Sequence, residues 1–317
     1  MRPLLATLRS LVRPVLTFVA TLAGAILLAQ LLLFLAPGDA ADIVASDPLL
    51  REGLIVEWGL DQPVLTRYAR FVSRALHGDL GTSLTYRPGA DVTTLVLPAA
   101  QRSLLLVLSA LVVSMGIGVG LAFVSAGRKS ASRRLLQWVS VLPVFLLAHL
   151  SMTLLNEWTF SLIQADRIQR PEWFALPDVD STLKTILAIL VLAIGSSAMT
   201  DIHIDSEQEL LRVRRSGFID AARARGAPLW PHLLWNLFPQ LTTIASSRTA
   251  FFVGGLVIVE KVLQLNGIGS MFWQACRLRD YPLALGITVV LAAVVCAARL
   301  LGDLLRLAID PRLRTRA

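Results

Sequence analysis

The sequence predicts an all-α integral membrane protein, and three observations support this prediction. Hydrophobic residues make up 55% of the 317 residues and charged residues only 16%, and the mean hydropathy is +0.65. Six stretches approach the roughly 20 apolar residues that a helix needs to cross a bilayer. Charged residues gather between these stretches. Soluble domains lie outside this range of composition, so we expect spanning helices joined by polar connections.

The six apolar stretches define the expected organisation of the chain. The predicted spans are residues 15–36, 97–126, 135–155, 183–199, 241–263 and 283–309. Around them lie a cytoplasmic N-terminus (1–14), an outward loop (37–96) and a cytoplasmic tail (310–317), and the core of residues 97–309 includes a cytoplasmic loop at 200–240. The first stretch exceeds the apolar region of a signal peptide, about 7–15 residues, so we expect it to remain as a span.

Clusters of arginine and lysine predict the orientation, because positive residues near span ends stay in the cytoplasm. The clusters lie in the N-terminus, the second and fourth connections and the tail, at Arg2, Arg9 and Arg13; Arg128, Lys129, Arg133 and Arg134; Arg212, Arg214, Arg215, Arg223 and Arg225; and Arg312, Arg314 and Arg316. In the two long alternate connections, 39–91 and 157–180, acidic residues match or outnumber basic ones. Both termini are therefore expected in the cytoplasm. The formal charge of +8 reflects topology rather than a nucleic-acid-binding patch.

Motifs of the common enzyme classes are missing from the sequence. No GxxxxGK[ST] occurs, so the chain cannot bind ATP by a P-loop. Any process of this protein that is driven by ATP must therefore use a partner that binds the nucleotide. HExxH and GxSxG are also absent. Cys276, Cys296 and the four scattered histidines form no ligand cluster. We therefore expect neither catalysis nor a metal or cofactor bound by this chain.

The cytoplasmic loop at 200–240 has the pattern of two helices joined by a tight turn. Ser206 and Glu209 form a capping box that predicts a helix start. Gly226 followed by Pro228 predicts a helix end, and Pro231 suits the first turn of a new helix. Small side chains in this segment permit close approach of another surface, with charge pairs at its rim, at Ala221, Ala222 and Ala224 and at Asp220, Arg223 and Arg225. The alternative is a solvated amphipathic linker.

Two further groups of residues are candidates for function. In the outward loop, an apolar stripe after Pro63 predicts a short amphipathic helix that lies against the membrane or a partner, or only packs on the bundle; its members are Leu65, Tyr68, Phe71, Val72 and Leu76. Within the spans, polar residues are costly and are candidates for a translocation path: Ser246, Ser247, Arg248 and Arg299. The alternative is that both arginines snorkel or pair, Arg299 with Asp303. Gly116, Gly118 and Gly120 favour close helix packing or a bend.

Residues 217–239 resemble the EAA loop of bacterial ABC importer permeases of the dipeptide, oligopeptide and nickel group. The matching positions are Phe218, Ile219, Ala222, Arg223, Ala224, Arg225 and Gly226, followed by His232, Asn236 and Pro239. Further matches to the "B" permease of that group run in order from Gly59-Leu60-Asp61-Gln62-Pro63 through Tyr68, Gly78-Asp79-Leu80-Gly81, Ser83, Leu97-Pro98-Ala99, Asn266-Gly267-Ile268-Gly269, Arg279-Asp280-Tyr281-Pro282 and Asp303 to Asp310-Pro311-Arg312.

Three departures accompany this resemblance. The stretch 201–209 is acidic where the family usually has arginine and serine, Leu265-Asn266 replaces a usual Trp-Pro, and Arg299 stands where asparagine is common. These changes leave the resemblance intact but leave the substrate class open among peptides, nickel and metal chelates.

The resemblance implies the type I ABC importer permease architecture in a bacterial cytoplasmic (inner) membrane. Two such permeases would form a heterodimer that works with two cytoplasmic ATPase subunits, which bind ATP and Mg²⁺, and with an extracytoplasmic substrate-binding protein. Residues 218–226 would form the coupling helix in a groove of an ATPase subunit, with Ala222 and Gly226 as the first candidates for contact and Asp220, Arg223 and Arg225 at the rim. The outward loop would help to dock the binding protein, with Asp61, Gln62, Tyr68 and Asp79 as candidates.

Two other classes of function compete with an importer permease. A non-transporting membrane anchor or sensor could keep the same fold and recruit a cytoplasmic partner through the same loop. A stand-alone secondary transporter would be favoured by inverted repeats and intramembrane acidic pairs, and the sequence shows neither.

Overall fold

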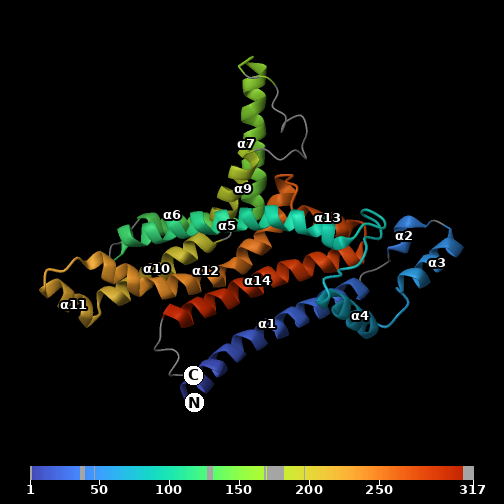
Figure 1. Ribbon diagram of the computed structural model, residues 1–317. Helices are drawn as coiled ribbons and strands as arrows, with labels where there is room; N and C mark the ends of the chain where they lie inside the picture. Colours follow the sequence, from blue (N-terminus) through green and yellow to red (C-terminus); the bar gives the residue numbers. More distant parts are fainter. Residues whose placement is uncertain are drawn as a thin grey trace. The chain divides into compact units, whose positions relative to one another are not determined.

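The computed structural model describes residues 2–35, 40–45, 47–126, 131–167, 169, 182–195 and 197–309 (Figure 1). Over these residues the chain is helical and contains a single isolated β-bridge, between Thr82 and Asp91. The predicted tail, half of residues 157–180 that the sequence places outward, and part of the basic second connection lie outside the described residues.

The helices are α1 (Arg2–Leu35), α2 (Ala41–Val44), α3 (Pro48–Trp58), α4 (Val64–Leu76), α5 (Val92–Ser125), α6 (Ala131–Ser140), α7 (Val144–Gln164), α9 (Thr182–Gly195), α10 (Ala198–Arg214), α11 (Gly217–Ala224), α12 (Leu229–Val262), α13 (Ile268–Arg277) and α14 (Tyr281–Ile309). They divide into two compact units. The first comprises residues 1–17, 105–265 and 297–317, and the second residues 18–104 and 266–296.

Four helices of the described part are long and apolar enough to cross a membrane. They are α1 from Pro14, α5, α12 and α14 to Arg306, and they cover the first, second, fifth and sixth predicted spans except for the last one to three residues of each. A fifth crossing is present if α9 and α10, which meet at a bend of 53°, count as one span. Six spans and cytoplasmic termini therefore remain predictions.

The third and fourth predicted spans are not continuous helices. Residues 135–155 are divided between α6 and α7, because the chain turns before Pro143, which has no backbone N–H to continue a helix. Residues 183–199 are divided where Ser197 adopts a left-handed conformation with φ of 56°. The predicted helix start at Ser206 is wrong, because α10 begins at Ala198 and Ser206 is buried inside that helix. A capping box is a local signal, and burial of apolar residues upstream of it extends the helix.

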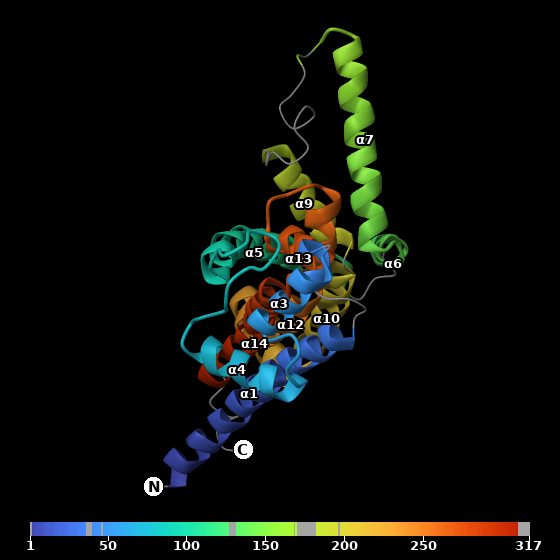
Figure 2. The ribbon, with the colours of Figure 1, turned by 90° about the vertical axis from the view of Figure 1, so that its right-hand side faces the viewer.

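In the first unit, α10 packs along α12, and α9 packs against both α7 and α12 (Figures 1 and 2). Gly118 of α5 allows the closest approach to α10, since a Cβ at this position would lie 2.8 Å from Ile202 and 3.2 Å from the carbonyl oxygen of Met199. Gly116 and Gly120 have nothing within 4 Å of such an atom. Of the three glycines predicted to allow close packing, Gly118 therefore makes the contact.

In the second unit, the buried carboxylate of Asp280 holds the segment that precedes α5. Its Oδ2 accepts hydrogen bonds from the Ser83 hydroxyl at 2.6 Å and from three consecutive backbone N–H groups, those of Leu84, Thr85 and Tyr86, at 3.0–3.1 Å. Its Oδ1 accepts from the N–H of Leu283 at 3.2 Å. Two motifs far apart in the sequence thus form one structural clip.

The predicted amphipathic helix of the outward loop is α4. Phe71 and Val72 are partly buried, and the Tyr68 hydroxyl donates to the carbonyl oxygen of Ala23 in α1 at 3.3 Å. Leu65 and Leu76, by contrast, are exposed. The apolar stripe is therefore narrower in the structure than the helical spacing predicts.

Candidate functional site

The short helix α11 lies between α10 and α12, and both of its ends are defined by the local sequence. Ser216 precedes it in an extended conformation. At the other end the N–H of Ala227 bonds the carbonyl of Ala222 and the N–H of Gly226 bonds that of Arg223, both at 3.0 Å, the pattern of a Schellman cap. Gly226 has φ of 69°, which glycine adopts without strain. The predicted end at Gly226 is confirmed.

The inward face of α11 is held by an apolar cluster of the first unit. Ile219 is completely buried and packs with Leu210 and Val213 of α10 and with Leu233 and Leu237 of α12. Partly buried residues that pack against the cluster are Phe123, Ala126, Leu229 and Leu241. Residues of α10, α11 and α12 therefore share one buried apolar cluster.

Ala222, the first candidate for a contact with a partner, is only 1% exposed. It lies one turn after Ile219 and on the same face, so it lets α11 lie close to its neighbours instead of presenting a surface. The exposed residues of the segment are Phe218, Asp220, Ala221, Arg223, Ala224, Arg225 and Gly226. The sequence predicted residues 218–226 as the contact segment, and the burial of each residue shows which face of the helix a partner protein could reach.

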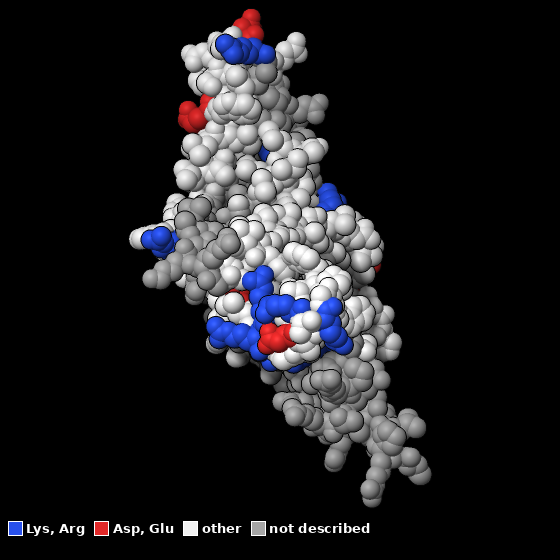
Figure 3. Space-filling model, turned by 90° about the vertical axis from the view of Figure 1, so that its left-hand side faces the viewer, with Lys and Arg blue, Asp and Glu red and all other residues white. Residues whose placement is uncertain are grey.

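The exposed face of α11 combines one aromatic side chain with a charged rim. Phe218 is 45% exposed. Asp220 and Arg223 form an exposed ion pair at 3.2 Å, and the Arg225 Nε donates to the carbonyl of Ala221. Figure 3 views the side of the molecule on which α11 lies in Figure 1 and shows arginine and lysine side chains gathered around acidic ones. A face that combines an exposed aromatic side chain with arginine side chains has the composition of a protein contact.

Arg248, a candidate for the translocation path, is held by two carboxylates of α10. Its Nη1 lies 3.0 Å from Asp201 Oδ2 and its Nη2 2.7 Å from Asp205 Oδ2. Its guanidinium also lies 5.7 Å from the ring centre of Phe251. Asp201 and Asp205 are four residues apart and therefore lie on one face of the helix. The acidic departure at 201–209 thus supplies counter-charges for an arginine in α12.

The other path candidates differ in surroundings. Ser246 lies against Gly302 of α14, where a Cβ would collide with its side chain, and Ser247 donates to the carbonyl of Ile244. Both serines therefore satisfy their hydroxyls within α12. Arg299 is exposed, and the described part of the chain shows no ion pair between it and Asp303. A role in translocation stays a prediction for all four residues.

Three of the four candidates for docking a binding protein have internal roles. Tyr68 anchors α4 to α1, as described above. The Gln62 Oε1 accepts from Arg70 at 2.7 Å, and Asp79 accepts from Arg74 and from the N–H of Gly81, both at 2.8 Å. These bonds lower the pKa of Asp79, the Arg74 hydrogen bond contributing most. Asp61 is exposed.

Sequence reasoning missed the two polar clusters that organise the units, namely the Asp280 clip and the Arg248 ion triad. The Asp201/Asp205 spacing of four, together with a lone arginine in an apolar helix, is a signal that could have found the triad. The Asp280 clip joins residues almost two hundred positions apart, and no local pattern indicates such a pairing.

Comparison with known proteins completes this description. Residues 101–315 match the family described as "Binding-protein-dependent transport system inner membrane component". A peptide permease protein of Brucella ovis is 30% identical over 300 residues, covering 89% of this chain and 92% of the relative. The oligopeptide transport system permease protein AppB of Bacillus subtilis is 27% identical, with 96% and 98% covered. The dipeptide transport system permease protein DppB of Escherichia coli is 24% identical, with 93% and 96% covered.

Proposed function

Because this chain belongs to the family of binding-protein-dependent transport system inner membrane components, we propose that it forms, with a second homologous permease, a translocation path for peptides. A related small solute, such as nickel or a metal chelate, is the alternative cargo. The relatives named above are peptide permeases, and these names favour peptides. The chain is a multi-pass inner-membrane permease subunit of an ABC transporter.

In this proposal, an extracytoplasmic binding protein delivers the solute, and two cytoplasmic ATPase subunits bind ATP and Mg²⁺ and supply the energy. The absence of a P-loop from the sequence supports the assignment of ATP hydrolysis to partners. Exposed apolar side chains of the candidate spans, such as Leu105 of α5, suit contact with lipid or with a second permease.

The observation that carries the proposal is the two-sided construction of α11. Its inner face, with Ile219 and Ala222, is fixed in an apolar cluster shared with α10 and α12. Its outer face presents Phe218 and the Asp220–Arg223 pair to the surroundings. A partner ATPase that binds the outer face would move α10 and α12 with α11, which is what coupling of ATP hydrolysis to the spans requires.

The test is reconstitution of this chain with the permease and ATPases encoded beside it, followed by assay of assembly and of substrate-stimulated ATP hydrolysis. Phe218→Ala removes the exposed apolar centre of α11 and is expected to weaken ATPase binding about tenfold or more, as truncation of an interface anchor does. Phe238→Ala is the matched control, because Phe238 is 51% exposed on α12 and lies outside α11. We expect Phe238→Ala to leave both readouts unchanged.

The two readouts also separate the rival functions. Loss of ATPase assembly in Phe218→Ala together with substrate-stimulated hydrolysis in the unmodified complex supports the importer. Assembly without any substrate stimulation in the unmodified complex would favour a non-transporting anchor or sensor. If Phe218→Ala and Phe238→Ala behave alike in both readouts, α11 is not the coupling helix.

A further inference from the structure

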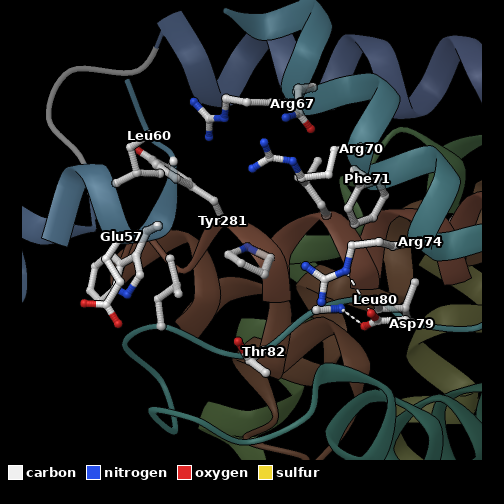
Figure 4. A pocket seen from close by; sticks show the side chains of 17 residues that line it. Glu57, Leu60, Arg67, Arg70, Phe71, Arg74, Asp79, Leu80, Thr82 and Tyr281 are labelled. Atoms are coloured by element: carbon white, nitrogen blue, oxygen red, sulfur yellow. Dashed lines mark hydrogen bonds and ion pairs between the residues drawn. The ribbon is translucent and has the colours of Figure 1, made fainter. Parts of the chain in front are cut away.

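The second unit contains a cavity of about 270 Å³ that the coupling mechanism does not use (Figure 4). Five parts of the chain line it: α1, the end of α3 with the turn after it, α4, the segment before α5, and the start of α14. Figure 4 shows Arg67, Arg70 and Arg74 of α4 directing their guanidinium groups toward the side of the cavity where Tyr281 lies. The cavity therefore has a strongly basic wall.

Two of these three arginines have no carboxylate partner in the described part of the chain. Arg74 is paired with Asp79 at 2.8 Å. Arg70, in contrast, donates to the neutral amide oxygen of Gln62, and the guanidinium of Arg67 lies over the Tyr281 ring at 5.7 Å from its centre. Burial lowers the pKa of Arg67 and the interaction with Tyr281 only partly opposes that shift. A positive charge that is removed from water in this way is stabilised by a bound anion.

A buried amide oxygen without a hydrogen-bond partner among the described residues lines the same cavity. Gln30 of α1 is only 4% exposed, and its Oε1 has no hydrogen bond among the described residues. A buried amide oxygen without a partner costs about 1–3 kcal/mol, so its presence here points to a ligand that supplies the missing bond. Since the two ends of an amide can exchange places, Gln30 can either accept a hydrogen bond or donate one.

The remaining lining sets the character of the ligand. Apolar and aromatic side chains form the walls beside the arginines, at Trp58, Leu60, Phe71, Leu80, Tyr281 and Leu285. Glu57 lies on the side of the cavity opposite Arg74 in Figure 4. A ligand with a carboxylate, a short hydrocarbon part and an ammonium group would satisfy all three features.

We propose that this cavity binds a small zwitterionic solute, with its carboxylate on Arg67 and Arg70, its hydrocarbon part on Phe71 and Tyr281, and its ammonium group toward Glu57. Planar guanidinium groups match carboxylates and hold them with charge-assisted hydrogen bonds. Gln30 takes up a polar group of the solute inside the cavity. The proposal concerns binding to this chain alone, so it stands or falls independently of the transport function.

The test uses the full chain in nanodiscs of neutral phosphatidylcholine, with dialanine as the probe and saturation-transfer NMR as the readout. Dialanine is expected to bind, and its C-terminal amide, which lacks the carboxylate, to bind about tenfold or more weakly. Arg67→Gln and Arg70→Gln should each weaken the binding of dialanine by a similar factor, and Gln30→Leu should weaken this binding as well.

Arg87→Gln is the matched control, because it removes one positive charge from the same unit at a residue that lies beside Tyr86 and does not line the cavity. It should leave binding unchanged. Size-exclusion chromatography shows whether Arg67→Gln misfolds. Because Arg70 is exposed, Arg70→Gln should fold normally and keeps the test valid in that case. Absence of dialanine binding, equal binding of the amide, or equal effects of Arg70→Gln and Arg87→Gln would each overturn the proposal.

Discussion

The Ser83 hydroxyl donates a 2.6 Å hydrogen bond to the buried carboxylate of Asp280, a residue 197 positions later in the chain. The same carboxylate oxygen accepts hydrogen bonds from the backbone N–H groups of Leu84, Thr85 and Tyr86. Three consecutive N–H groups directed at one oxygen form an anion-binding concavity of the backbone. The segment before α5 is therefore fixed to the start of α14 by a single side chain.

Asp280→Asn is expected to destabilise the chain by about 3 kcal/mol or more, because the amide cannot replace a charged acceptor of five hydrogen bonds. The measurement is the free energy of unfolding of the full chain in a denaturant titration. Asp61→Asn, at an exposed aspartate of the same unit, should change it by less than about 0.5 kcal/mol. Equal effects of the two substitutions would show that the Asp280 clip contributes little to stability.

Gly118→Ala is expected to separate α5 from α10, because the new methyl group would lie 2.8 Å from Ile202 and close to two backbone atoms. The expected cost is about 1–3 kcal/mol. Gly116→Ala and Gly120→Ala place a methyl group in open space and should be neutral or stabilising by up to about 1 kcal/mol. Thermal unfolding of the three variants in one detergent provides the comparison, and a neutral Gly118→Ala would contradict the packing described here.

Arg248→Met is expected to destabilise the first unit because it leaves Asp201 and Asp205 without their counter-charge. The side chain of Arg248 is 20% exposed and those of the aspartates 37%, so partial screening limits the cost to about 1–2 kcal/mol. Adding Asp201→Asn and Asp205→Asn should restore much of the lost stability. If the triple variant is no more stable than Arg248→Met in a denaturant titration, the ion triad is not what the substitution disrupts.

Gly226→Ala tests the turn after α11 with no change in packing, because nothing lies within 4 Å of an added Cβ. Its φ of 69° is unfavourable for alanine by about 1–2 kcal/mol. Gly217→Ala, also in open space but at the first residue of α11, should instead be slightly stabilising, by less than about 1 kcal/mol. In thermal unfolding we expect Gly226→Ala to lower the midpoint temperature and Gly217→Ala to raise it. A change in the same direction for both variants would argue against strain at Gly226.

Much of the organisation of this chain could be read from local patterns. Long apolar runs predicted α1, α5, α12 and α14, since their composition is imposed by the hydrocarbon they cross. The glycine of a left-handed cap predicted the end of α11 at Gly226, because that conformation excludes most other residues. Family motifs located the candidate coupling segment, and relatives along nearly the whole chain confirm the family.

Features that depend on distant contacts were not predictable in this way. The apolar stretch at 135–155 has the composition of one span, although Pro143 within it marks the division into α6 and α7, and the capping box at Ser206 indicated a helix start where burial keeps α10 continuous. Which side of α11 is free, with Phe218 outside and Ala222 inside, followed only from the packing of α10 and α12 around it.

By itself, then, the sequence determined the membrane-spanning character, the family and the position of α11, because hydrophobic length, charge placement and special backbone conformations are local properties. Only the tertiary structure decided that Arg248 meets Asp201 and Asp205, that Asp280 binds Ser83, and that two arginines and Gln30 share a cavity. The reason is physical: the energy of a charge or an amide depends on which partners folding brings within a few ångströms, and residues far apart in the chain supply those partners.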